Sequence, residues 1–125
     1  MITLYHNPRC SKSREALSVL QDFCQRHQEN LNVIEYLKQA PSRATLDTLA
    51  QALMAAGTTD VRAMLRNNEE PYAALHLQDA DAAALLDALA QHPILLQRPL
   101  VLYAGQARIA RPVDGLEEWL LSIKP

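Results

Sequence analysis

The chain has 125 residues, of which 49% are hydrophobic, and its formal net charge at pH 7 is −2. This length and apolar content are sufficient for one domain with a real hydrophobic core. The balanced charge argues against nucleic acid or an anionic membrane as a partner, and the sequence has no apolar run long enough to cross a bilayer.

The first elements that the sequence predicts are a strand, a helix and a second strand. A short apolar run predicts a strand over residues 2–5. After a polar loop, apolar residues at helical spacing predict a helix that closes near Gln28, with a stripe formed by Ala16, Leu17, Val19, Leu20, Phe23 and Cys24. Residues 31–37 are apolar and partly β-branched, which predicts a buried strand parallel to the first and hence a right-handed βαβ unit.

The segment from about 42 to 92 is predicted to be an all-helical insertion. Ser42 is suited to cap a helix that ends at Gly57, with the apolar face Leu46, Leu49, Ala50, Leu53 and Met54. A short helix is expected from Thr59 or Asp60 to Leu65. A longer helix is expected over residues 79–91, with the inward face Ala83, Leu86, Leu89 and Ala90.

Two strands and a helix are predicted to close the chain. Residues 100–103 and 107–110 flank Ala104, Gly105 and Gln106, a pattern typical of a hairpin. Residues 117–123 form a helix that turns Trp119 and Leu120 toward the sheet. We therefore expect an α/β fold over residues 1–125, with a small mixed four-stranded sheet, flanking helices and one domain.

Cys10 stands at the junction between the first strand and the helix that follows it. There its sulfur would meet the positive end of the helix and the cations Arg9, Lys12 and Arg14, which favour the thiolate. The alternative is an inert buried thiol, but the polar and turn-forming neighbours argue against a core position. We interpret Cys10 as an activated nucleophile.

Cys24 is the only other cysteine, and it lies on the apolar stripe of the same helix. We expect it to be buried and unreactive. Two cysteines, without a cationic leader segment and without metal-ligand spacing, predict a cytoplasmic protein with no structural disulfide and no bound metal.

The residues around Cys10 leave some roles open. Ser11 and Ser13 can each donate a hydroxyl to the thiolate or cap the helix, and His6 can be a proton partner or a hydrogen-bonding residue of the loop. Because position 13 is serine, Cys10 has no partner thiol in a Cys-x-x-Cys pair. The sixth position after Cys10 is Ala16, which excludes the arginine of a phosphatase-type phosphate loop.

Residues 5–14, Tyr-His-Asn-Pro-Arg-Cys-Ser-Lys-Ser-Arg, resemble the active-site loop of the glutaredoxin-dependent arsenate reductases, in which a strand precedes His-Asn-Pro-x-Cys-x-x-Ser-Arg. Further segments follow in the order of that family: 36–37, 41–43, 61–66, 70–72, 91–99 and 107–112. The resemblance covers nearly the whole chain and implies a thioredoxin-like fold. Arg9 and the pair Ser11-Lys12 differ from the better-known members, which have a small residue and Gly-Thr there.

The resemblance also implies a site and its partners. Cys10 would be the catalytic nucleophile, and Arg66, Arg98 and Arg111 would bind a tetrahedral oxyanion such as arsenate. The supporting residues would be His6, Ser13, Arg14 and Pro99, with a cis peptide bond expected at Pro99. Glutathione would be the co-substrate and glutaredoxin the protein partner of a monomer that holds no cofactor.

Three other interpretations stay open. Each arginine alone is typical of a solvated residue or an ion-pair partner of Glu69, Glu70 or Asp114. Relatives on the same fold act as redox-responsive transcription regulators that bind RNA polymerase, but they typically have Cys-x-x-Cys where this chain has Cys10 and Ser13. A glutathione-linked thiol oxidoreductase with another substrate would share the site without the arsenic chemistry.

Overall fold

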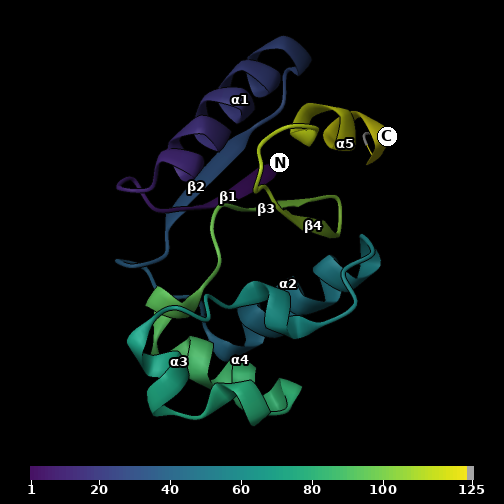
Figure 1. Cartoon of the computed structure of the whole chain (residues 1–125). Helices are drawn as coiled ribbons and strands as arrows, with labels where there is room; N and C mark the ends of the chain where they lie inside the picture. Colours follow the sequence, from purple (N-terminus) through teal and green to yellow (C-terminus); the bar gives the residue numbers. More distant parts are fainter. Residues whose placement is uncertain (124–125) are drawn as a thin grey trace.

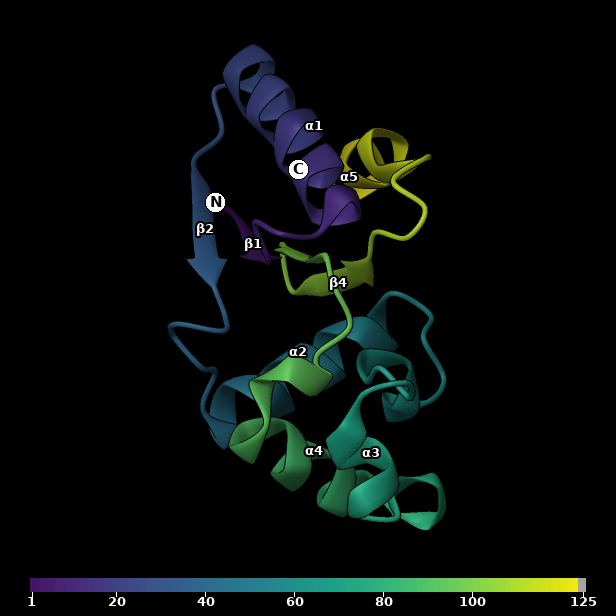
Figure 2. The same cartoon turned by 60° about the vertical axis from the view of Figure 1, so that its left-hand side comes forward.

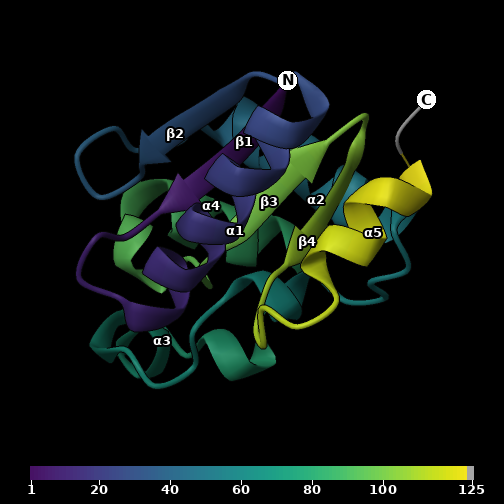
Figure 3. The same ribbon diagram turned by 90° about the horizontal axis from the view of Figure 1, so that it is seen from above.

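The computed structural model describes residues 1–123, so Lys124 and Pro125, the end of the expected domain, lie outside the described residues. Its sheet has the strand order β2-β1-β3-β4, formed by β1 (Ile2–His6), β2 (Leu31–Glu35), β3 (Leu100–Tyr103) and β4 (Gln106–Ile109). β1 pairs with β2 in parallel and with β3 antiparallel, and β4 pairs antiparallel with β3 (Figure 3). The predicted mixed four-stranded sheet is confirmed.

Helices cover the sheet in two layers (Figures 1 and 2). On one side lie α1 (Ser11–His27) and α5 (Leu116–Ile123). On the other side lie the helices between β2 and β3, which are α2 (Arg43–Ala55), α3 (Glu70–Ala74) and α4 (Ala82–Gln91), with the 3₁₀ helices η1 (Val61–Met64), η2 (Leu77–Asp79) and η3 (Pro93–Leu95). Within residues 1–123, no helix combines the length and apolarity that crossing a membrane requires.

Each layer has its own hydrophobic cluster. Successive residues of a strand point to opposite faces of the sheet, so Leu4 lies in the cluster beneath α1 and α5, whereas Tyr5 lies in the cluster beneath α2. Leu20 and Phe23 fill the first cluster from α1, and Leu120 fills it from α5. Side chains of the central strand β1 are therefore packed on both faces of the sheet. This packing fixes the strand and the start of the loop that follows it.

The predictions for the burial and length of β2 and for the burial of Met54 are wrong. β2 is an edge strand, so its side chains are half-buried or exposed rather than buried, and it ends at Glu35. Met54, placed on the inner face of α2, is 49% exposed. The short helix predicted before Arg66 is present, as the 3₁₀ helix η1 with Asp60 at its N-cap.

The fourth predicted helix is shorter than expected. α4 begins at Ala82, where the Asp81 side chain caps it by accepting a hydrogen bond from the Ala84 N–H at 2.9 Å. Its buried face consists of Leu85, Leu86, Ala88 and Leu89, so that Ala83 is exposed and Ala90 only partly buried. Alanine is apolar at every position of such a helix and does not by itself mark the inner face.

The C-terminal hairpin is as predicted, with β4 beginning one residue earlier. Ala104 and Gly105 form a two-residue turn and both have positive φ, 51° and 77°, as the tight turn of a twisted hairpin requires. In α5, Leu120 is buried as predicted and Trp119 is partly buried.

Candidate active site

Asn7 organises the loop between β1 and α1. Its carbonyl oxygen accepts a hydrogen bond from the Cys10 N–H, and its side-chain Oδ1 accepts one from the Arg9 N–H, both at 3.0 Å. Its own N–H donates to the Ser13 Oγ at 3.0 Å. The Asn7 side chain is also a hydrogen-bond partner of Tyr36. The sequence motif included Asn7, but its role becomes visible only in these contacts.

Cys10 is the N-cap residue of α1, in extended conformation. Its sulfur faces the first N–H groups of the helix without a cap bond of standard geometry. Burial raises the pKa of the thiol, but the Ser13 N–H, the Arg98 guanidinium and the Lys12 N–H outweigh this effect, so the pKa of Cys10 is lowered. The thiolate is thereby favoured.

The charge that acts on Cys10 does not come from its own loop, as the sequence had suggested. The side chains of Arg9, Lys12 and Arg14 are exposed, and Arg14 donates from Nη1 to the Pro8 carbonyl at 3.0 Å. The cation that lowers the pKa of Cys10 is Arg98, which lies 88 positions further along the chain. Water screens exposed charges, whereas Arg98 is half-buried and its Nε and Nη1 are buried.

His6 and Ser13 support the loop from within. His6 Nδ1 lies 2.6 Å from Ser13 Oγ, and both residues are buried. Burial lowers the pKa of His6, the Arg14 charge acts in the same direction, and Glu35 opposes it. A neutral His6 therefore holds the Ser13 hydroxyl, which also accepts the Asn7 N–H. These contacts give His6 and Ser13 a loop-supporting role, and donation from the Ser13 hydroxyl to the thiolate stays an alternative.

A backbone bridge brings Arg66 and Arg98 together. Leu65 pairs with Leu96, the Arg66 N–H donates to the Leu95 carbonyl, and the Gln97 N–H donates to the Met64 carbonyl, the last two at 2.7 Å. Arg98 keeps Nε and Nη1 buried without a hydrogen-bond partner among residues 1–123. Such donors are costly to leave unpaired.

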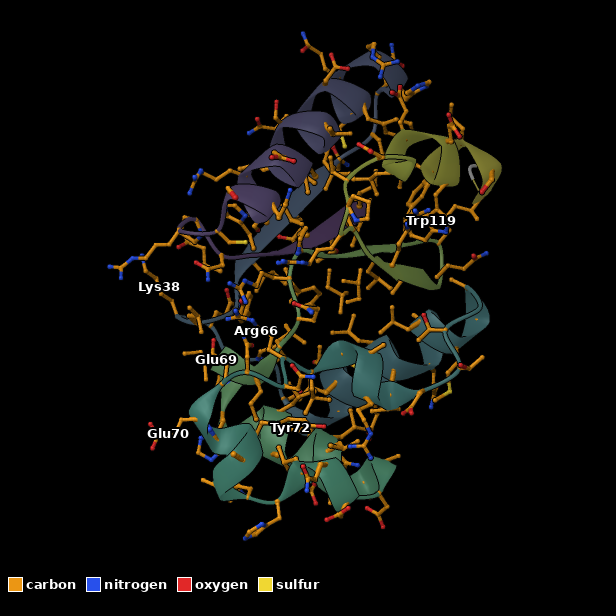
Figure 4. All side chains as sticks on the ribbon, viewed as in Figure 1. Lys38, Arg66, Glu69, Glu70, Tyr72 and Trp119 are labelled. Carbon is orange, nitrogen blue, oxygen red and sulfur yellow. The ribbon has the colours of Figure 1, made fainter. Side chains whose placement is uncertain are left out.

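Arg66 has a partner already. Its Nη1 lies 2.5 Å from Glu69 Oε1, and the two side chains are only 19% and 24% exposed (Figure 4). Glu69 is the N-cap residue of α3, yet its side chain makes no cap bond. The open alternative that Arg66 pairs with Glu69 is therefore confirmed.

Tyr36 joins these groups from the end of β2. The side chain is 1% exposed, and burial raises the pKa of its hydroxyl, while Arg98 and Arg66 lower it and Cys10 raises it. Tyr36 thus lies within electrostatic reach of both arginines and the cysteine. The sequence did not predict this role for Tyr36, although β1 and β2 were predicted to be parallel and their carboxyl ends share one edge of the sheet.

Arg111 lies beside the Arg98 backbone rather than in the interior. It is exposed and donates from Nη1 to the Arg98 carbonyl at 3.3 Å. The Arg98–Pro99 bond is cis as predicted, and the Arg111–Pro112 bond is cis as well. Among residues 1–123, no three His, Cys, Asp or Glu side chains are grouped to hold a metal ion.

Comparison with known proteins agrees with this geometry. The family model of the ArsC family matches residues 5–119. Over 118 residues the chain is 39% identical to an arsenate reductase of Neisseria meningitidis serogroup B, covering 93% of this chain and 95% of the relative. It is 37% identical to the uncharacterized protein YfgD of Escherichia coli K12, with 94% of each chain covered.

A solved structure supports the same assignment. The arsenate reductase from Vibrio cholerae is 42% identical and superposes with a TM-score of 0.81, covering 98% of this chain and 97% of that one. The expected thioredoxin-like α/β fold is confirmed by this likeness. The chain belongs to the ArsC family.

Proposed function

We propose that the protein is an arsenate reductase in which the Cys10 thiolate attacks an oxyanion bound by Arg66, Arg98 and Arg111. The observation that carries this proposal is the Arg98 guanidinium, which lowers the pKa of Cys10 while its Nε and Nη1 stay buried without partners among the described residues. The planar fork of a guanidinium matches two oxygens of a tetrahedral oxyanion. One residue therefore activates the nucleophile and offers donors to the substrate.

In the first step, the Cys10 sulfur forms a bond to arsenic and one arsenic–oxygen bond breaks. The departing oxygen takes up protons and leaves as water. The guanidinium groups stabilise the negative charge on the remaining oxygens. We assign His6 and Ser13, which hold the loop, Arg14, which bonds to the loop carbonyl of Pro8, and Pro99, which follows Arg98, supporting roles.

Reduction of arsenic from the +5 to the +3 state takes two electrons, which two thiols supply as they become a disulfide. Cys10 provides one sulfur. The second must come from outside, because position 13 is serine and Cys24 is buried in the core. We assign it to glutathione, with glutaredoxin releasing glutathione from Cys10, so that arsenate and two glutathione give arsenite, glutathione disulfide and water. We propose that the enzyme works as a cytoplasmic monomer without a bound cofactor.

The thiol donor can be tested directly. Arsenite is measured with the purified protein and arsenate, once with glutathione and glutaredoxin and once with thioredoxin and its reductase. We expect turnover with glutathione and glutaredoxin only. Equal rates would assign a different donor, and no arsenite with either would contradict the proposal. Copurification with RNA polymerase in that last case would favour the regulator hypothesis.

A further inference from the structure

A groove follows the outer edge of β4. It lies where β4 passes between α5 and the segment that links α2 to η1 (Figure 1), and its volume is about 510 Å³. This is the size of a typical small-molecule site. Its lining includes Gln97, Ala107, Arg108, Ile109, Arg111 and Trp119. We call it the β4-edge groove.

The backbone of β4 offers hydrogen bonds to this groove. β4 is the last strand of the described sheet, and Arg108 lies opposite Val101 in β3. The Ala110 N–H bonds to the Pro99 carbonyl at 2.9 Å, which sets the alternation of paired residues. Residues 107 and 109 therefore turn their N–H and C=O groups away from β3, but Ala107 is only 1% exposed, so the groups that the groove can reach are those of the half-buried Ile109. An extended peptide can pair with such an edge.

Two guanidinium groups give the groove a positive charge. Arg108 is half-buried and Arg111 is exposed, and neither forms an ion pair within residues 1–123. Trp119 lies beside them between α5 and β4 (Figure 4). Guanidinium groups that are not paired with protein carboxylates are suited to bind carboxylates of a ligand.

The groove points toward the cysteine. β1 and β4 both run antiparallel to β3, so the two strands end at the same edge of the sheet. They are two strand spacings apart, about 10 Å. Arg111, at the end of the groove, bonds to the carbonyl of Arg98, whose guanidinium acts on Cys10. A peptide of a few residues in the groove can thus bring a thiol to this edge.

We propose that the β4-edge groove binds glutathione, with a carboxylate on Arg108 and a peptide amide on the outward N–H and C=O groups of Ile109. This inference rests on the proposed function for the identity of the thiol. Glutathione is a short peptide with two amide bonds and two carboxylates, so it matches both the strand edge and the Arg108 guanidinium. A small dithiol without amides or carboxylates has nothing to bind there.

The test is an NMR titration of the whole protein with S-methylglutathione, whose blocked sulfur cannot react. We expect shifts of the Ile109 amide and of the Trp119 indole N–H. Arg108→Gln should weaken binding roughly 10-fold, since a charge-assisted hydrogen bond is lost, and Arg108→Lys should restore part of it. Arg26→Gln is the matched control, because Arg26 is an exposed arginine of α1 outside the groove.

A second ligand tests the role of the carboxylates. The diethyl ester of S-methylglutathione should bind the wild type no more tightly than Arg108→Gln binds S-methylglutathione. An unchanged affinity in Arg108→Gln, or shifts confined to other parts of the protein, would overturn the groove assignment. Because the titration contains no arsenate, its outcome is separate from the proposed reduction: failure to form arsenite with intact glutathione binding would overturn the reaction alone.

Discussion

The Arg98 guanidinium lowers the pKa of the Cys10 thiol, although the two residues lie far apart in the sequence. The two residues meet because β3 follows Arg98 and pairs with β1, which leads to Cys10. Nε and Nη1 of Arg98 are buried without partners among the described residues. In the proposed mechanism, activation of the nucleophile and binding of the oxyanion therefore depend on the same side chain.

Arg98→Gln should raise the pKa of Cys10, since the substitution removes the charge that stabilises the thiolate. The pH dependence of Cys10 alkylation by iodoacetamide, followed on the Cys10 peptide by mass spectrometry, measures this shift. Arg9→Gln is the control, because Arg9 is an exposed cation of the loop. If Arg9→Gln raised the pKa as much as Arg98→Gln, the loop cations would be the source of activation after all.

Cys24→Ala should leave arsenite formation within about twofold of the wild type. Cys24 is buried, and burial, together with the Glu29 charge, raises the pKa of its thiol, while the N-terminal amine opposes this. The substitution should cost about 1 kcal/mol of stability, a usual value for a small core deletion. Activity is measured at a temperature where both proteins are folded, and a loss of arsenite formation there would show that Cys24 takes part in the reaction.

Glu69→Gln should strengthen oxyanion binding about 3- to 10-fold. The carboxylate holds Arg66 Nη1, and removing its charge frees a donor and lowers the repulsion of an anion. Inhibition of arsenite formation by inorganic phosphate and the KM for arsenate both measure the effect. Glu70→Gln is the control, since the neighbouring Glu70 is exposed. Weaker binding in Glu69→Gln alone would mean that Glu69 positions Arg66 instead of competing for it.

The stability of the protein should fall on the acid side of neutrality, in part through His6. Burial lowers the pKa of His6 in the folded protein, so the unfolded chain takes up the proton first as the pH falls through about 6.5. The free energy of unfolding then decreases until the pH passes the folded pKa. Urea unfolding at pH 7.5, 6 and 5 measures this decrease. We expect a smaller decrease in His6→Asn but not in the control His76→Asn, where the histidine is exposed.

The parts of the fold that were predicted correctly are those that depend on residues close together in the sequence. The stripe of α1 and the hairpin turn at Ala104 and Gly105 are encoded by neighbouring residues. α3 was missed because it has only five residues and is held by burial of Tyr72, and short helices form only through such packing. The half-exposed state of β2 follows from its place at the edge of the sheet, which no local pattern reports.

The candidate site shows the same division. The sequence predicted that Cys10 and His6 lie at the junction between the first strand and the first helix. The three arginines were suggested by the resemblance to the arsenate reductases. Tyr36 was missed because it reaches the site from the end of β2 through contacts across the fold, whereas the sequence offered the pairing of Arg66 with Glu69 as one of its alternatives. The mistaken role of the loop cations has the same origin, because only the three-dimensional structure separates exposed charges from Arg98.

The most direct test is arsenite formation from arsenate, with glutathione and glutaredoxin, by the wild type and by Cys10→Ser. The serine variant keeps the arginines, and circular dichroism serves as the check that it is folded. We predict steady arsenite release by the wild type and none above the protein-free background by Cys10→Ser. Equal rates in the two proteins would contradict the assignment of Cys10 as the nucleophile.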